Sequence, residues 1–194
     1  MKKGDFVQFK YNDYEKGELT LTGEYLGKGS FSTCFKVDSL VYSFVRTDKD
    51  HVDYSKEAIS QWAEENPHIP EFKNVGDFKN GEVYTSPLYN ELTKKNKQAW
   101  SQYKLIASLA NKNLRYNKKG YNLFINREFI DSLKDVISDE IFNALHILND
   151  AMSNYGDFYM MEFPKRNLKV NDEGNLILLD VFFNPKALKW YNRS

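Results

Sequence analysis

Towards the end of the chain, the sequence NLKVNDEGNLILLD, from Asn167 to Asp180, predicts a β-hairpin. Two short apolar runs flank the sequence NDEG, in which Asn, Asp and Gly favour a turn. Because the hairpin starts at Asn167 and ends at Asp180, we expect both side chains at one rim of a rigid element. Asn and Asp oxygens are hard ligands that suit Mg²⁺ shared with the phosphates of a nucleotide. Either residue alone can also be a turn or cap residue, and that structural interpretation stays open.

The composition limits the classes of protein to consider. The chain has 194 residues, enough for one compact unit or two small lobes. Lys plus Arg and Asp plus Glu both number 27, and this zero net charge argues against a protein that binds a nucleic-acid backbone. Cys34 is the only cysteine, which excludes an internal disulfide and a cysteine-based zinc site. The first residues lack the apolar run of a signal peptide and no stretch is long enough to span a membrane, so we expect a cytoplasmic protein.

The first part of the chain has the alternating pattern of antiparallel strands, and later segments have helical spacing. Strands are expected over residues 17–27, 31–37, 40–46, 71–78 and 81–88. Helices are expected over residues 54–65, 96–112 and 139–156. Ser138 would cap the last helix and Gly156 would end it. These patterns predict an α+β chain with a sheet-rich part over residues 1–88, a helical part over 89–194, and a connector near Leu88–Glu91.

Two further motifs accompany the hairpin. In YLGKGSFSTCFKV (25–37), Gly27 and Gly29 fall between two predicted strands, whereas a dinucleotide-binding fold needs a helix after its glycines. A hairpin tip of small residues can lie over a triphosphate and offer backbone N–H groups to it, although a turn that needs positive φ explains the same glycines. In EFPKRN, Glu162 precedes Asn167 by five residues, which is the spacing of the kinase catalytic loop D-x-x-x-x-N.

Together these motifs resemble the protein-kinase superfold, and within it the early serine/threonine protein kinases of short-tailed coliphages. That family carries a G-x-G-x-F-S loop, a V-x-K-V strand, a P-x-I-P stretch and a D-x-H-x-x-N…D-P segment, in this order. Here they correspond to GKGSFS, VYSF, PHIP and EFPKRN…LLDVF, within residues 20–185. The resemblance implies a minimal bilobal kinase-like fold, with an antiparallel-sheet N-lobe and a truncated helical C-lobe, and ATP and Mg²⁺ as cofactors.

The resemblance also implies roles for individual residues. It assigns nucleotide binding to Gly27, Gly29 and Ser32 over the phosphates, Cys34 against the base, and Pro87 and Leu88 in the hinge (84–92) that meets the adenine. Glu57 would pair with the nucleotide-binding lysine, unless it is an ordinary solvated carboxylate. Asn167 and Asp180 would bind Mg²⁺, and Glu162 would take the place of the catalytic base.

Two residues depart from the kinase pattern. Ser43 replaces the strand lysine expected in VYSF, and a serine cannot supply the cation that holds the α- and β-phosphates. Lys36 lies two residues beyond Cys34, so alternation puts both on one face, where Lys36 is either a substitute for that lysine or a surface residue. Glu162 replaces the catalytic aspartate, and its extra methylene moves the carboxylate by roughly 1.5 Å; a displacement of about 1 Å can cost on the order of a hundredfold in rate.

Three functions follow from the resemblance. The first is a phage-encoded kinase that binds Mg²⁺-ATP between its lobes and phosphorylates Ser or Thr residues of host proteins during host takeover. The second is an inactive pseudokinase that binds and inhibits a host defence or transcription protein. Ser43, Glu162 and the short sequence after Asp180, which leaves no activation segment, favour this second function. The third is a small-molecule phosphotransferase or nucleotide-transferring enzyme on the same scaffold.

Overall fold

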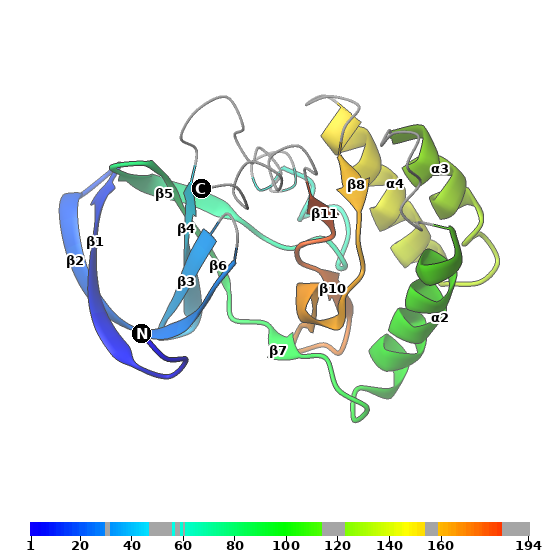
Figure 1. Ribbon diagram of the computed structural model, residues 1–194, viewed down its shortest axis with the longest axis horizontal. Helices are drawn as coiled ribbons and strands as arrows, with labels where there is room; N and C mark the ends of the chain where they lie inside the picture. The colour runs from blue at the N-terminus through cyan, green and yellow to red at the C-terminus, as the bar shows by residue number, and fades with distance from the viewer. Residues whose placement is uncertain are drawn as a thin grey trace. The chain divides into compact units, whose positions relative to one another are not determined.

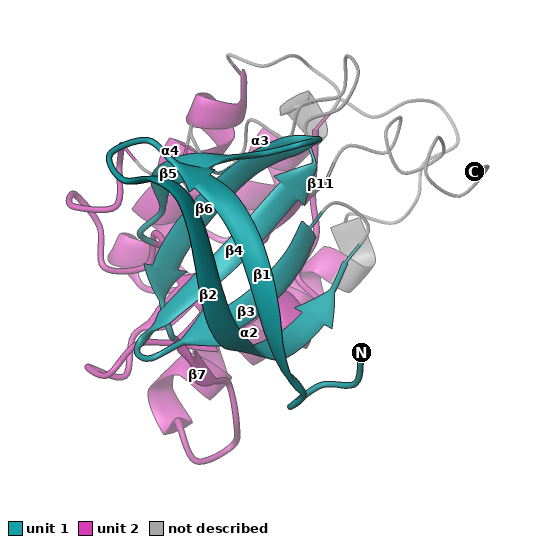
Figure 2. Cartoon of the chain, turned by 90° about the vertical axis from the view of Figure 1, so that its left-hand side faces the viewer, with its two compact units in different colours: residues 1–57, 71–88 teal, residues 58–70, 89–194 magenta. Residues whose placement is uncertain are grey.

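A computed structural model describes residues 1–29, 32–46, 56, 59, 61–113, 123–153 and 159–183. Within these ranges the chain is an α+β protein with one main antiparallel sheet, two small sheets and three α-helices (Figure 1). It divides into two compact units, the first comprising residues 1–57 and 71–88 and the second residues 58–70 and 89–194 (Figure 2). No helix in the described ranges is long and apolar enough to cross a membrane.

The main sheet of the first unit is a closed barrel with the strand order β1-β2-β3-β4-β6-β5. Its strands are β1 (Phe6–Asp13), β2 (Gly17–Lys28), β3 (Ser32–Val37), β4 (Leu40–Arg46), β5 (Lys73–Phe78) and β6 (Gly81–Pro87). Strands β2 to β6 confirm the five predicted segments, but β1 was not predicted. This strand pairs with β2 along its length and with β5 at Asn12 and Asp13. The antiparallel sheet that we expected therefore closes on itself, because an additional strand joins its two edges.

Aromatic side chains fill the inside of the barrel. The buried cluster consists of Phe9, Tyr11, Phe35, Phe44 and Val83. The rings of Phe9 and Phe35 stack with centroids 4.7 Å apart, and Phe44 packs edge-on against Phe9 at 5.3 Å. Such ring pairs add to the stabilisation that comes from burying apolar area. By strand alternation, Cys34 and Ser43, which are paired across β3 and β4, lie on the opposite face.

The second unit contains the helices α2 (Lys97–Asn113), α3 (Leu123–Asp131) and α4 (Asp139–Ser153), and α3 packs against both of the others (Figure 1). The predicted apolar stripe of α4 is confirmed, because Ile141, Leu145, Leu148 and Met152 are almost fully buried. The Ser138 hydroxyl accepts the Ile141 N–H at 3.4 Å and caps this helix as expected. Helix α3 was not predicted. Gly156 and most of the helix predicted over residues 54–65 lie outside the described residues.

Short strands complete the second unit. They form one sheet of β7 (Asn90–Glu91), β9 (Leu168–Val170) and β10 (Leu176–Leu178), and another of β8 (Met160–Met161) and β11 (Phe182–Phe183). The 3-10 turn η1 (Lys165–Asn167) leads directly into β9. The predicted hairpin is confirmed: β9 and β10 are antiparallel, and Gly174 adopts a φ of 89° in the turn between them. Glycine adopts such positive φ values without the steric cost that other residues meet.

Candidate functional site

The open end of the β9–β10 hairpin brings Asn167 and Asp180 together. The backbone N–H groups of Leu179 and Asp180 donate to the Asn167 carbonyl oxygen at 3.1 and 3.2 Å. Asn167 is itself held by η1, because its N–H donates to the Pro164 carbonyl at 2.9 Å. The two residues that we expected at one rim are therefore joined by backbone hydrogen bonds, which fix the positions of the two Cα atoms that carry the side chains.

The side chain of Asn167 links this rim to Glu162. Asn167 is only 7% exposed, and its Nδ2 donates to Glu162 Oε1 at 2.9 Å. An asparagine amide offers both donors and an acceptor. With the amide nitrogen turned to Glu162, the Oδ1 atom remains as the acceptor for another group. Asp180 is exposed.

The backbone of Glu162 is fixed from the opposite side. Its N–H donates to the Val181 carbonyl at 2.8 Å, next to the β8–β11 pair. Its side chain is 35% exposed, and Arg166 Nη2 lies 3.8 Å from Oε1. The Glu162 carboxylate is thus oriented by an amide and a guanidinium group, while part of it still faces solvent. A positioned carboxylate of this kind can accept a proton from a hydroxyl group.

The donor set at this rim fits Mg²⁺ that arrives with a nucleotide. Mg²⁺ is commonly held by one or two carboxylates together with substrate phosphates and waters. Asp180 and the Oδ1 atom of Asn167 supply oxygen ligands of the required chemistry. The described residues contain no cluster of three or more His, Cys, Asp or Glu side chains suited to a metal ion. A divalent ion at this rim would therefore need oxygen ligands from a bound molecule as well.

The glycine motif of the first unit differs in detail from the prediction. We expected Gly27 and Gly29 at the hairpin tip, but Gly27 lies within β2, opposite Cys34, next to an irregularity in the pairing. Its φ of 151° explains the glycine, because residues with a side chain rarely adopt this conformation. A Cβ placed there would meet nothing within 4 Å, so close packing is not the reason. The Gly29 N–H donates to the Ser32 carbonyl at 2.8 Å and closes the turn. The tip itself, residues 30–31, lies outside the described residues.

Ser43 and Lys36 lie on one face of the sheet. Ser43 is 5% exposed, and its Oγ lies 3.5 Å from Cys34 Sγ on the neighbouring strand. Lys36 is two residues from Cys34 and pairs with Val41, so it is on the same face and two residue pairs further along. No cation occupies the position of Ser43 itself. Lys36 is a nearby cation on the same face, and its role as a substitute for the kinase lysine stays a prediction.

The remaining predicted residues are placed as follows. Pro87 is the last residue of β6, and the Leu88 N–H donates to the Ser39 carbonyl at 2.9 Å, just before the first unit ends. Glu57 lies outside the described residues.

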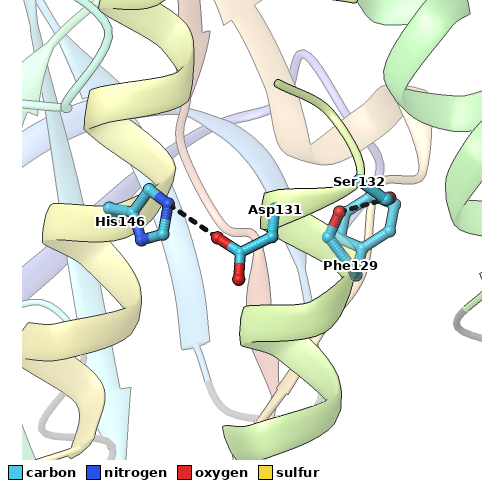
Figure 3. Close-up of polar contacts among 4 residues, drawn as sticks. All are labelled: Phe129, Asp131, Ser132 and His146. Carbon is cyan, nitrogen blue, oxygen red and sulfur yellow. Dashed lines mark hydrogen bonds and ion pairs between the residues drawn. The ribbon is translucent and has the colours of Figure 1, made fainter. Parts of the chain in front are cut away.

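One polar contact was not predicted from the sequence. His146 on α4 lies with its Nε2 atom 3.4 Å from Asp131 Oδ1 at the end of α3 (Figure 3). Ser132 follows Asp131, but its hydroxyl donates to the Phe129 carbonyl at 2.6 Å, and Figure 3 shows it on the other side of Asp131 from His146. A nucleophilic serine would need a hydrogen bond to the histidine. We therefore interpret the His146–Asp131 pair as a contact between two helices.

The structure brings together the three candidate residues of the second unit, Glu162, Asn167 and Asp180, through hydrogen bonds of Asn167. Six candidates of the first unit lie on β2, β3 and β4 or, for Gly29, in the turn between β2 and β3: Gly27, Gly29, Ser32, Cys34, Lys36 and Ser43. No protein-family model, no curated protein and no solved structure matches this chain.

Proposed function

We propose that this chain is a kinase-like protein that binds ATP together with Mg²⁺, with Asn167 and Asp180 as the protein ligands of the ion. The observation that carries the proposal is the junction at Asn167, whose backbone fixes Asp180 and whose side chain fixes Glu162. Phosphoryl transfer depends mainly on positioning and on neutralising phosphate charge. A rim that presents two oxygen ligands beside an oriented carboxylate suits both requirements.

The first unit supports the same proposal through its order of elements. β2 and β3 form the hairpin that carries Gly27 and Gly29, and the following strand, β4, carries Ser43 at the position of the kinase lysine. A glycine-rich loop and then a lysine strand is the order found in protein kinases. The resemblance implies that the hairpin would offer backbone N–H groups to the phosphates, and Lys36 is the candidate for the missing cation.

In the proposed reaction, Glu162 accepts the proton of a Ser or Thr hydroxyl on a protein substrate. The hydroxyl oxygen forms a bond to the γ-phosphorus as the bond from that phosphorus to the bridging oxygen of ADP breaks. Bound Mg²⁺ supplies charge neutralisation at the phosphates. The Asn167 amide keeps the Glu162 carboxylate directed at the rim, which matters because this side chain is longer than the usual aspartate.

A second candidate is a pseudokinase that binds a host protein without transferring phosphate. The observation that favours it is Ser43, which is buried and in contact with Cys34 where a kinase needs a cation. In both cases the kinase-like resemblance points to a phage protein that acts on a host protein. The two candidates differ in catalysis and not in the nucleotide site.

Thermal unfolding with and without Mg²⁺-ATP tests nucleotide binding. At a nucleotide concentration about 100 times the Kd, binding adds about 2.7 kcal/mol to the free energy of unfolding. For a chain of this size, that stabilisation raises Tm by roughly 5–10 °C. Asp180→Ala should abolish the rise. Asp150→Asn, an exposed aspartate on α4, serves as the matched control and should keep it.

No rise with the wild-type chain, or an equal rise with Asp180→Ala, contradicts the proposed site. Transfer of labelled γ-phosphate to protein then separates the two candidates. An active kinase loses about a hundredfold or more of its rate in Glu162→Gln, while its thermal shift persists. A wild-type chain that binds Mg²⁺-ATP without transferring phosphate is a pseudokinase.

A further inference from the structure

A second site is suggested by a cavity at the other end of the β9–β10 hairpin. Its volume is about 160 Å³, and it lies between the start of α4, the N-terminal part of α2, and the turn around Gly174. Asn167 and Asp180 are at the open end of the hairpin, whereas this cavity is lined from the turn end, Gly174 to Leu176. A cavity of about 150 Å³ can hold a molecule the size of benzene.

His68 is the buried polar residue that lines this cavity. It is 6% exposed, and its Nδ1 lies 2.7 Å from the Leu176 carbonyl oxygen. A carbonyl accepts only, so Nδ1 carries the proton and donates. In the neutral ring, Nε2 is then a bare acceptor. Among the described residues, no hydrogen bond to Nε2 is present.

The backbone of His68 is fixed by two further hydrogen bonds. The His68 N–H donates to Asn66 Oδ1 at 2.9 Å, and its carbonyl accepts the Leu178 N–H at 2.9 Å. Asn66 in turn donates to the Glu140 carbonyl at 2.9 Å, so the segment is tied to the first turn of α4. Burial lowers the pKa of His68 below its usual value, which keeps the imidazole neutral near pH 7. The acceptor is therefore preorganised.

The other polar side chains of the cavity include one carboxylate and three amides. Glu140 is one of the lining residues, and its negative charge favours the protonated form of His68. Gln98, Gln102 and Asn175 contribute amides, and the Gln102 oxygen already accepts the Ser138 N–H at 3.3 Å. One carboxylate and one neutral imidazole are too few ligands for a zinc site, which needs at least three protein ligands. A ligand with hydrogen-bond donors and a positive charge meets these groups better than an anion would.

We propose that this cavity binds a compact organic cation that carries N–H donors, a guanidinium or primary ammonium group, with Glu140 and His68 Nε2 as its acceptors. The site is independent of the proposed nucleotide site and uses none of its residues. The same chemistry is available from a free small molecule or from an arginine or lysine side chain of a partner.

The test is a titration of the full ¹⁵N-labelled chain with methylguanidinium chloride, followed at the His68 ring nitrogens by NMR. We expect a saturable shift of the Nε2 signal, with a Kd on the order of 1 mM for a ligand of this size. Methylurea has nearly the same shape without the charge, and tetramethylammonium has the charge without N–H groups. Each should bind about tenfold more weakly or worse, because charge-assisted hydrogen bonds are the strong ones.

Two variants locate the site. Glu140→Gln removes the charge but keeps the shape, and should weaken methylguanidinium binding by about tenfold. Asp139→Asn is the matched control in the same turn of α4, because Asp139 is exposed and does not line the cavity; its Kd should be unchanged. Glu140 is also exposed, so neither change threatens folding.

A titration with an arginine amide whose α-amino group is blocked distinguishes a protein side chain from a free small molecule as the source of the cation. Binding as tight as that of methylguanidinium identifies a protein side chain as an allowed source, and absence of binding restricts the site to free small cations. The proposal is overturned if the wild-type chain shows no saturable shift, if methylurea binds equally well, or if Glu140→Gln binds like the wild type.

Discussion

Asn167 is the residue on which the candidate nucleotide site depends. Its backbone carbonyl accepts two N–H groups at 3.1 and 3.2 Å, and its side-chain nitrogen contacts Glu162 at 2.9 Å. One residue therefore sets the position of both the proposed ligand Asp180 and the proposed base Glu162. An ordinary turn or cap asparagine would bond its own neighbouring backbone instead, so the contact with a carboxylate five residues away favours a functional role.

The substitution Asn167→Asp tests this contact. It keeps the size of the side chain but replaces the donor by a second carboxylate oxygen next to Glu162. We expect the free energy of unfolding at neutral pH to fall by roughly 1–3 kcal/mol, since a buried hydrogen bond is lost and like charges meet. Mg²⁺ with ATP should recover part of that loss.

Urea denaturation measures the change, and Asn143→Asp on the exposed side of α4 is the control. If Asn167→Asp is as stable as the wild type without added Mg²⁺, the bond between Asn167 and Glu162 does not form in solution.

His68 gives a prediction about pH. Burial is the main cause of its lowered pKa, while the bond to the Leu176 carbonyl and the charge of Glu140 act in the opposite direction. As the pH falls, His68 of the unfolded chain therefore binds a proton near its usual pKa of 6.5, whereas His68 of the folded chain binds one only at a lower pH. Stability from this group is present above that pH and is lost as the pH falls through the folded-state pKa.

Denaturation curves between about pH 7.5 and pH 5.5 should show this decline for the wild type and a weaker one for His68→Gln. Equal slopes for the two proteins would mean that His68 is not buried in its neutral form.

At the scale of elements, β1 determines that the main sheet is a closed barrel. It meets β5 at only two residue pairs, Asn12 with Asp77 and Asp13 with Gly76. A Cβ on Gly76 would overlap the Asn12 carbonyl oxygen and lie 2.9 Å from the Tyr11 ring. The close approach of β1 to β5 therefore requires glycine at this position.

Gly76→Ala should separate β1 from β5. Overpacking of this kind costs about 1–3 kcal/mol of unfolding free energy, and the amide hydrogens of Asn12 and Asp13 should exchange faster. Gly29→Ala is the control, because a Cβ there meets only the Ser32 carbonyl oxygen, at 4.0 Å. Exchange rates that are unchanged in Gly76→Ala would contradict barrel closure at this point.

The elements that sequence reasoning found are those with a clean period. The first part of β2 alternates, turn residues separate β3 from β4 and β5 from β6, and α4 has four apolar residues on one stripe, so local patterns were sufficient. In β1 the exposed Phe6 breaks the alternation of the buried Phe9 and Tyr11. In α3 the buried residue Asn126 interrupts the apolar stripe. Its side-chain amide donates to the Tyr159 carbonyl and accepts the Met161 N–H, from residues more than thirty positions further along the chain. Only the tertiary structure therefore explains an asparagine at this position.

At the scale of the whole molecule, the change from strand to helix period places a boundary near Leu88, and the first unit ends at that residue. Residues 58–70 belong to the second unit although they precede β5 in the sequence. The reason is a set of long-range hydrogen bonds, from Asn66 to Glu140 and from Leu178 to His68. Such partners cannot be read from a local pattern.

The candidate nucleotide site, too, could be predicted from the sequence only where local patterns determine it. Hairpin patterning and spacing predicted that Asn167 lies near Asp180 and shares a loop with Glu162. The pair of His146 with Asp131 joins two helices, and the cavity at His68 joins segments far apart in the sequence; nothing in their spacing indicated them.

The most direct test of the metal rim replaces Mg²⁺ by Mn²⁺, which prefers the same oxygen ligands and is paramagnetic, in the presence of ATP. We predict that the NMR signals of the Asn167 side-chain amide and of the Leu179 and Asp180 backbone amides broaden beyond detection, and that Asp180→Ala prevents this broadening. If these three signals stay sharp in the wild-type chain while ATP and Mn²⁺ are both present, Asn167 and Asp180 do not hold the ion and the proposed function is wrong.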